Sequence, residues 1–206
     1  MGKTTFRFFF IFIFCAGSLG SGWAQIGGYN TYKFLGYSNS ARIAGLGGNF
    51  LAINDNDITL TQANPSLITP EMSNNLAFSY VHSPGGINYG FVMYSYDFKK
   101  VGSFVGSLQY INYGKFTGMD ASENPTGDFF ASEYALNIGW GRKLTPLFSI
   151  GANGKLIYSQ LDTYHSFGIA VDVAGTYTSK DQTFTASLIG RNIGIELSPY
   201  ITNQRV

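Results

Sequence analysis

The sequence has very few of the residues from which disulfide frameworks and zinc sites are built. Among its 206 residues it has one cysteine, Cys15, and two histidines, His82 and His165. A lone cysteine forms no disulfide within its own chain. Neither histidine has a second histidine or cysteine at the spacing of metal ligands. We therefore expect neither a disulfide framework nor a metal site.

The motifs of common catalytic and cofactor sites are also missing. No Gly-x-Ser-x-Gly elbow occurs. Residues 45–50 depart from the dinucleotide-binding Gly-x-Gly-x-x-Gly because Phe50 stands in the last position. Residues 54–57 lack the glycine and glutamate that complete a calcium loop, so a solvated turn is the better interpretation. We expect a protein that is not an enzyme and has no cofactor.

Charge is scarce as well. Charged residues make up 12% of the chain, and the formal net charge is +1. This share is about half the usual one. A nearly neutral chain has no overall attraction for nucleic acid or for an anionic surface. Beyond the N-terminal segment no apolar run reaches the roughly 18 residues of a transmembrane helix, which excludes a helical membrane protein.

The N-terminus has the pattern of a secretory signal peptide. Lys3 and Arg7 supply the basic start, residues 8–16 form a short apolar core, and Gly22-Trp23-Ala24 ends in the small residue that a signal peptidase needs. We predict a signal peptide over residues 1–24. A membrane anchor is the alternative, but the apolar core is too short to span a bilayer as a helix. The mature chain is then exported and contains no cysteine.

Bulky apolar residues alternate with small or polar ones from residue 131 to 178. In the first segment the bulky set is Tyr134, Leu136, Ile138 and Trp140, and the small or polar set is Glu133, Ala135, Asn137 and Gly139. Segments 147–160 and 166–178 repeat the scheme. Strands of roughly 10 to 13 residues exceed the usual length of about 5 to 6 and suit a tilted strand that crosses a bilayer. A secreted β-sandwich with the bulky residues inside is the alternative.

The alternation predicts an all-β fold, a transmembrane antiparallel β-barrel. Seven strands are expected, at 76–83, 87–98, 101–114, 131–142, 147–160, 166–178 and 183–192. We place the short polar links at 99–100, 143–146 and 179–182 on the periplasmic side. The long loop 115–130 and the link 161–165 then lie outside. Aromatic residues near the strand ends fit interfacial girdles.

Residues 25–75 lack such alternation and are dense in glycine, asparagine and serine. We interpret them as a compact hatch, followed by the barrel strands in residues 76–206. One helical turn or two are expected within 38–46. A second short helix is expected from Asp57, as its cap, to Ala63, because Pro65 ends a helix before it.

The strand count suggests a partial barrel. Bacterial outer-membrane barrels close with an even number of strands, and an open edge in lipid leaves backbone groups unpaired. We expect a truncated sequence. In the alternative, residues 194–206 form the last strand of a complete eight-stranded barrel, but Pro199 falls in mid-strand and the stretch does not alternate.

Several segments of the chain together carry a likeness to a known family. They are residues 31–35, 40–49, 64–67 and 70–72 in the expected hatch and 87–90, 109–116, 148–153 and 191–194 in the expected barrel. In combination they resemble the PorQ family of the type IX secretion system of Bacteroidota. Asn64-Pro65 recurs across PorV proteins and FadL-type transporters, so the resemblance to PorQ depends on the combination. The hatch motif comprises Ser40, Ala41, Arg42, Gly45, Leu46, Gly47, Gly48, Asn64 and Pro65.

The resemblance implies a FadL/PorV-like outer-membrane barrel of about 14 strands with the hatch inside, of which this chain holds the hatch and the first half of the strands. It also implies partners similar to PorU, PorV and PorZ, in a complex that processes secreted cargo at the cell surface and joins it to lipopolysaccharide. The sortase-like chemistry would be carried by PorU, and this chain would be a scaffold.

Four polar residues are candidates for holding the hatch to the barrel wall: Arg42, Lys155, Asp172 and Arg191. The loop 115–130 is the candidate outer contact with partners. A FadL-like uptake channel for hydrophobic molecules is the alternative function. An apolar ligand pocket beside the hatch and a lateral opening in the wall would distinguish it.

Overall fold

The computed structural model describes residues 31–38, 40–48, 52–53 and 55–200. The expected signal peptide, residues 1–24, lies outside the described residues, and so do Asn49 and the tail 201–206. All the elements below belong to the unit Tyr32–Val206. No helix in these ranges is long and apolar enough to span a membrane.

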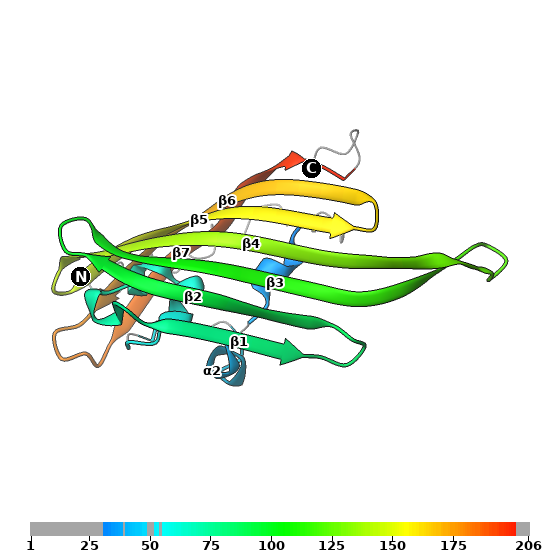
Figure 1. Cartoon of the computed structure of the whole chain (residues 1–206). Coiled ribbons are helices and arrows are strands. Elements are labelled where there is room, and N and C mark those ends of the chain that lie inside the picture. The colour runs from blue at the N-terminus through cyan, green and yellow to red at the C-terminus, as the bar shows by residue number, and fades with distance from the viewer. Residues whose placement is uncertain (1–30, 39, 49–51, 54, 201–206) are drawn as a thin grey trace, which may run out of the picture. The chain divides into compact units, whose positions relative to one another are not determined.

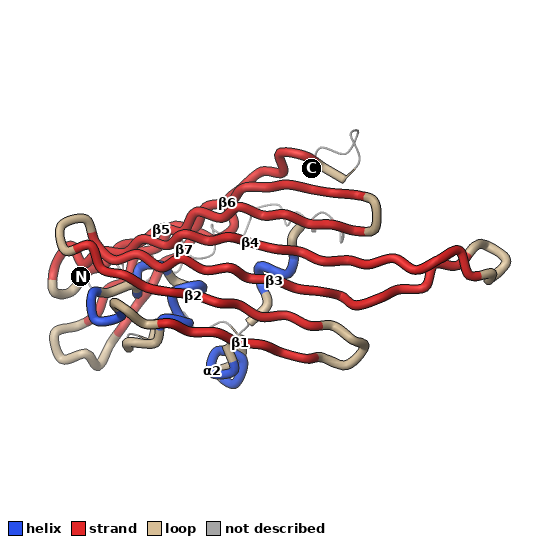
Figure 2. Tube along the Cα trace, in the orientation of Figure 1, coloured by secondary structure: helices blue, strands red, loops and turns tan. Residues whose placement is uncertain are grey.

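The described chain forms one antiparallel sheet of seven strands, in which neighbours in sequence are neighbours in space (Figure 1). The strands are β1 (Leu76–His82), β2 (Asn88–Phe98), β3 (Gly102–Met119), β4 (Pro125–Thr145), β5 (Phe148–Leu161), β6 (Tyr164–Thr178) and β7 (Thr185–Ser198). Helix is confined to short turns (Figure 2). The predicted all-β class is confirmed, and each predicted strand is present.

The prediction of a long loop over residues 115–130 is wrong. After a bulge at 112–115, β3 and β4 continue to pair almost to the tip. The reason is a tight turn at Asp120, whose carboxylate accepts the backbone N–H groups of Ser122 and Asn124, each at 2.8 Å. Residues 115–130 therefore form an extended hairpin that projects beyond the neighbouring strands (Figure 1).

Strand β7 runs further than predicted. A bulge interrupts its pairing with β6 between Gly190 and Ile193. An extra residue in one strand moves the side chains beyond it to the opposite parity. This is why the sequence did not alternate there, and why Leu188 before the bulge and Ile195 after it are both exposed. Residues 194–198 continue β7, so the alternative in which they begin an eighth strand is wrong.

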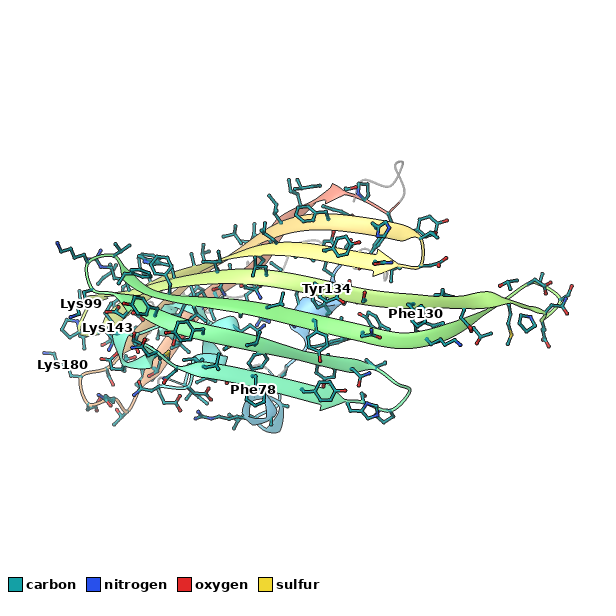
Figure 3. The ribbon with its side chains drawn as sticks, viewed as in Figure 1. Phe78, Lys99, Phe130, Tyr134, Lys143 and Lys180 are labelled. Carbon is teal, nitrogen blue, oxygen red and sulfur yellow. The ribbon has the colours of Figure 1, made fainter. Side chains whose placement is uncertain are left out.

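One face of the sheet carries bulky apolar side chains and the other carries small or polar ones. In β4, Leu136 and Ile138 are 46% and 58% exposed, whereas Ala135 and Asn137 are 0% and 5% exposed. Phe78 on β1 is 81% exposed on the bulky face (Figure 3). A soluble sandwich would bury the bulky set, so this arrangement is the reverse of the one that the sandwich alternative requires.

The bulky face contains a continuous line of apolar residues across every strand. Register places one residue from each strand directly opposite the next: Phe78, Val92, Leu108, Leu136, Leu156, Ile169 and Ile195. We call this line the apolar row. All its members are exposed. Monomeric soluble proteins rarely expose a contiguous apolar surface of this extent.

The predicted hatch folds as short helical turns. They are η2 (Lys33–Gly36), α2 (Ala41–Gly45), η3 (Ile58–Gln62), η4 (Pro65–Leu67) and η5 (Pro70–Met72). Both expected helices are present as α2 and η3, and Asp57 caps η3 by accepting the N–H of Thr59 at 2.9 Å. Pro65 and Pro70 occupy first positions of their turns, where the missing N–H costs no hydrogen bond.

The hydrophobic core lies between the hatch and the small-residue face of the sheet. Ile58, Ile68 and Met72 of the hatch pack with Phe91 and Val105 of β2 and β3. A second cluster, around Phe34, includes inward residues of four strands: Ile111, Ala135, Ile157 and Ala170. Because one small hatch is contacted by strands from β2 to β6, the sheet must curve around it.

Candidate functional site

The contact between the hatch and the sheet is centred on Asn64, which is fully buried. Its side-chain Nδ2 donates to the Thr176 hydroxyl on β6 at 3.1 Å and to the Ser187 hydroxyl on β7 at 3.2 Å. Its Oδ1 accepts from the backbone N–H and the hydroxyl of Ser66, at 3.0 and 2.6 Å. The Ser66 and Thr176 hydroxyls lie 2.7 Å apart. One amide thus caps η4 and joins it to two strands.

Glycines of the sheet allow the hatch backbone to approach it closely. A Cβ on Gly151 of β5 would lie 2.3 Å from the carbonyl carbon and oxygen of Pro65 and 2.6 Å from the Ser66 nitrogen. On Gly141 of β4 it would lie 2.6 Å from Cβ of Ile68 and 2.8 Å from the Pro65 oxygen. All but one of these contacts are with backbone atoms, and the Cβ of Ile68 is fixed by its own backbone, so rotation of a side chain cannot relieve them. Only glycine fits at these positions with the hatch in place.

Further polar contacts hold the hatch along its length. Gln62 of η3 donates through Nε2 to Oε1 of Gln109 on β3 at 2.8 Å, and Gln109 donates to the carbonyl oxygen of Phe34 at 3.0 Å. The hydroxyls of Tyr32 and Ser166 are 2.5 Å apart, which links the start of the hatch to β6. Burial raises the pKa of Tyr32 to about 12.

Arg42 lies within the hatch motif and makes its ion pairs inside the hatch. Its guanidinium is 2.5 Å from the Asp55 carboxylate and 3.1 Å from that of Asp57. The hydrogen bond from Arg42 holds the pKa of Asp55 below its ordinary value. Arg42 therefore ties α2 to the start of η3, and among the described residues no ion pair joins it to the wall.

Among the other residues of the hatch motif, some pack within the hatch and others are exposed to solvent. Ser40 occupies the N-cap position of α2 without a side-chain capping hydrogen bond, and its hydroxyl accepts from the Thr59 hydroxyl at 3.1 Å. Gly47 and Gly48 have φ of 92° and 83°, the left-handed region that glycine favours. The exposed members are Ala41, Gly45, Leu46 and Gly47.

Lys155 and Asp172 form a buried ion pair on the small-residue face of the sheet. The Lys155 Nζ is 2.7 Å from Oδ2 of Asp172 and 2.7 Å from Oδ1 of Asn192. Asp172 also accepts from Nδ2 of Asn153 at 3.3 Å and from the backbone N–H of Asn192 at 2.8 Å. This pair joins β5, β6 and the bulge of β7. Arg191 is exposed beside it in that bulge.

The sequence prediction included Asn64 and Pro65 but missed most of their partners. On the sheet, the missed residues share one property: they are small or polar residues at inward positions of the strand alternation. They are Gln109, Gly141, Gly151, Thr176 and Ser187, and the missed residues of the hatch are Gln62 and Ser66. The inward parity was visible in the sequence, but which inward positions meet the hatch was not.

The interface offers hydrogen bonding and close packing. In the described part of the chain no group of three histidine, cysteine or acidic side chains is placed to hold a metal ion. Comparison with protein-family models finds no match, and comparison with the curated proteins finds none either.

Proposed function

We propose that this chain is part of an outer-membrane β-barrel that acts as a non-enzymatic scaffold in the attachment complex of a type IX secretion system. The apolar row carries the membrane part of the proposal. Seven exposed apolar residues on seven paired strands suit lipid. The inner face, polar and covered by a hatch, suits a barrel interior.

The edges of the sheet support closure into a barrel. The sheet order leaves β1 and β7 as its outer strands. A strand edge in lipid has no water to satisfy its N–H and C=O groups. We therefore propose that β1 and β7 pair with further strands in the membrane.

The extended hairpin is the proposed contact with partner proteins similar to PorU, PorV or PorZ. It projects beyond the other strands and carries exposed apolar residues, among them Met119 and Phe130, which are 64% and 59% exposed. Its stem is held by stacked Phe116 and Phe129, with ring centroids 5.1 Å apart. A rigid projecting stem with apolar side chains can bind a partner without loss of much conformational entropy.

Affinity capture tests the scaffold. The full chain is expressed with an affinity tag in a strain that has a type IX system, and capture is expected to recover PorU-like or PorZ-like proteins. Replacing residues 117–128 by a two-residue turn should reduce recovery, while the protein stays in the outer-membrane fraction. Replacing the β1–β2 turn at 84–86 is the matched control and should leave recovery unchanged. Equal recovery from all three proteins contradicts the hairpin assignment.

A FadL-like transporter is the second candidate, and one observation favours it. A cavity of about 610 Å³ lies beside the hatch, lined by residues that include Tyr37, Ile87, Tyr89, Ile111 and Tyr113. Its volume is in the range of small-molecule sites. Saturable uptake of a fatty acid that depends on this protein, with no partner captured, would select the transporter over the scaffold.

A further inference from the structure

Two neighbouring turns at one end of the sheet enclose a cavity of about 230 Å³. The turns are those between β4 and β5 and between β6 and β7. Two lysines and several hydroxyls line the cavity, including Lys143, Lys180, Thr69, Thr145, Ser149 and Ser179. The near-neutral net charge of the chain gave no sign of this local concentration of positive charge.

The cavity lining itself carries positive charge, and two carboxylates lie just outside the lining. None of its lining residues is acidic. Glu71 is 3.6 Å from Nζ of Lys143, and both side chains are about half exposed, so this ion pair is weak. Asp181 accepts instead from the Ser179 and Thr183 hydroxyls at 2.5 and 2.7 Å. No ion pair of Lys180 is present among the described residues.

The cavity borders the apolar outer face. Phe148 lines it and lies directly opposite Tyr177 on β6. Both rings are exposed, at 40% and 42%. Lys99, in the turn between β2 and β3, lies at the same end of the sheet as Lys143 and Lys180 (Figure 3). The positive charges therefore stand at the boundary where the apolar surface ends.

We propose that this cavity binds the phosphate group of an anionic phospholipid. Lysine ammonium groups and hydroxyls are hydrogen-bond donors, and phosphate oxygens are acceptors. A neutral ligand would leave Lys143 with only its weak ion pair to Glu71, and would give Lys180 no ion pair among the described residues. The exposed Phe148 and Tyr177 give the acyl chains an apolar surface beside the head group. This inference rests on the proposed membrane location and adds to it a specific lipid contact.

Lipid titration of the full chain tests the inference. The protein is purified in lauryldimethylamine oxide, which has no phosphate, and is titrated with dihexanoyl-phosphatidylglycerol, with dihexanoyl-phosphatidylcholine and with inorganic phosphate. Phosphorus NMR of each titrant reports binding. We expect the tightest binding for phosphatidylglycerol. The double variant Lys143→Gln, Lys180→Gln should lose roughly 30-fold in that affinity, since each lysine near a lipid surface contributes about 1 kcal/mol.

The matched control is Lys99→Gln with Lys100→Gln, which removes the same charge at the same end without changing the cavity. It should lose less than about threefold. An equal loss in both double variants means diffuse surface charge and overturns the inference, as does the absence of phosphatidylglycerol binding. If inorganic phosphate binds as tightly as phosphatidylglycerol, the cavity does not recognise a lipid, and the inference is overturned. Outer-membrane fractionation of the same proteins judges the proposed function separately, because it does not depend on lipid affinity.

Discussion

The side-chain amide of Asn64 in the hatch donates to the hydroxyl of Thr176 on β6 across 112 positions of the sequence. The same side chain also donates to the Ser187 hydroxyl on β7 and caps η4 by accepting from the Ser66 N–H. All of these groups are buried or half-buried. The Asn64 side chain therefore holds the hatch on the sheet, and both its amide nitrogen and its amide oxygen make hydrogen bonds.

Asn64→Ala is expected to loosen the hatch. The change leaves the buried Ser66 N–H without its acceptor, and a buried unsatisfied group costs about 1 to 3 kcal/mol. A lower urea midpoint and faster proteolysis within residues 31–75 would show this. Asn88→Ala serves as control, because the Asn88 side chain makes its hydrogen bonds at an exposed site. If both variants keep the wild-type midpoint, Asn64 does not seat the hatch.

Gly151→Ala should displace the hatch from the wall. The added methyl would meet the Pro65 carbonyl at 2.3 Å, and overpacking of this kind costs about 1 to 3 kcal/mol. Gly154→Ala, on the outer face of the same strand, meets nothing within 4 Å and is the matched control. Urea unfolding compares the two. Equal midpoints for the two variants would contradict the close approach.

Asp172→Ala should be among the most destabilising single changes in the wall. It leaves the buried Lys155 ammonium without its carboxylate, which costs about 3 to 5 kcal/mol. The double variant Asp172→Leu, Lys155→Met should recover much of the loss, since no buried charge remains. The free energy of unfolding in lipid vesicles measures both. A double variant no more stable than Asp172→Ala alone would mean that the pair does not act as a unit.

The contact at Tyr32 should fail in alkali. Burial raises the pKa of Tyr32 from 10.0 to about 12, so the folded state favours the neutral phenol. This contribution is complete below pH 10 and is lost as the pH rises through about 12. Proteolysis of the hatch should therefore accelerate over that window, and Tyr32→Phe should remove this part of the acceleration. The ultraviolet difference spectrum between the two proteins gives the titration directly; a midpoint near 10 would contradict burial.

The strands were predictable because each follows from local alternation. Leu136 and Asn137 differ in size and polarity, and this difference alone assigned their faces. The pattern failed in two places for a local reason that alternation does not encode. The turn at Asp120 makes residues 115–130 a hairpin where a loop was predicted. The bulge near Asn192 reverses which alternate side chains of β7 face outward.

The hatch interface was less predictable because its partners lie far apart in the sequence. Asn64 and Ser187 are separated by 123 positions. The glycine at 151 looked like any small inward residue, and only the position of Pro65 explains it. Arg42 was predicted, because of its charge, to hold the hatch to the barrel wall. Its ion pairs are with Asp55 and Asp57, which are in the hatch itself.

The most direct measurement of the central claim is the environment of the apolar row. The one cysteine of the chain, Cys15, is first replaced by serine. Single cysteines are then introduced by Leu136→Cys and Leu156→Cys in the row and by Met119→Cys at the extended hairpin. Each is spin-labelled in the full chain reconstituted in vesicles. The two row positions should be accessible to oxygen and shielded from a water-soluble nickel complex, and position 119 should show the reverse. Access of the nickel complex to positions 136 and 156 equal to that at 119 would contradict a membrane-facing sheet.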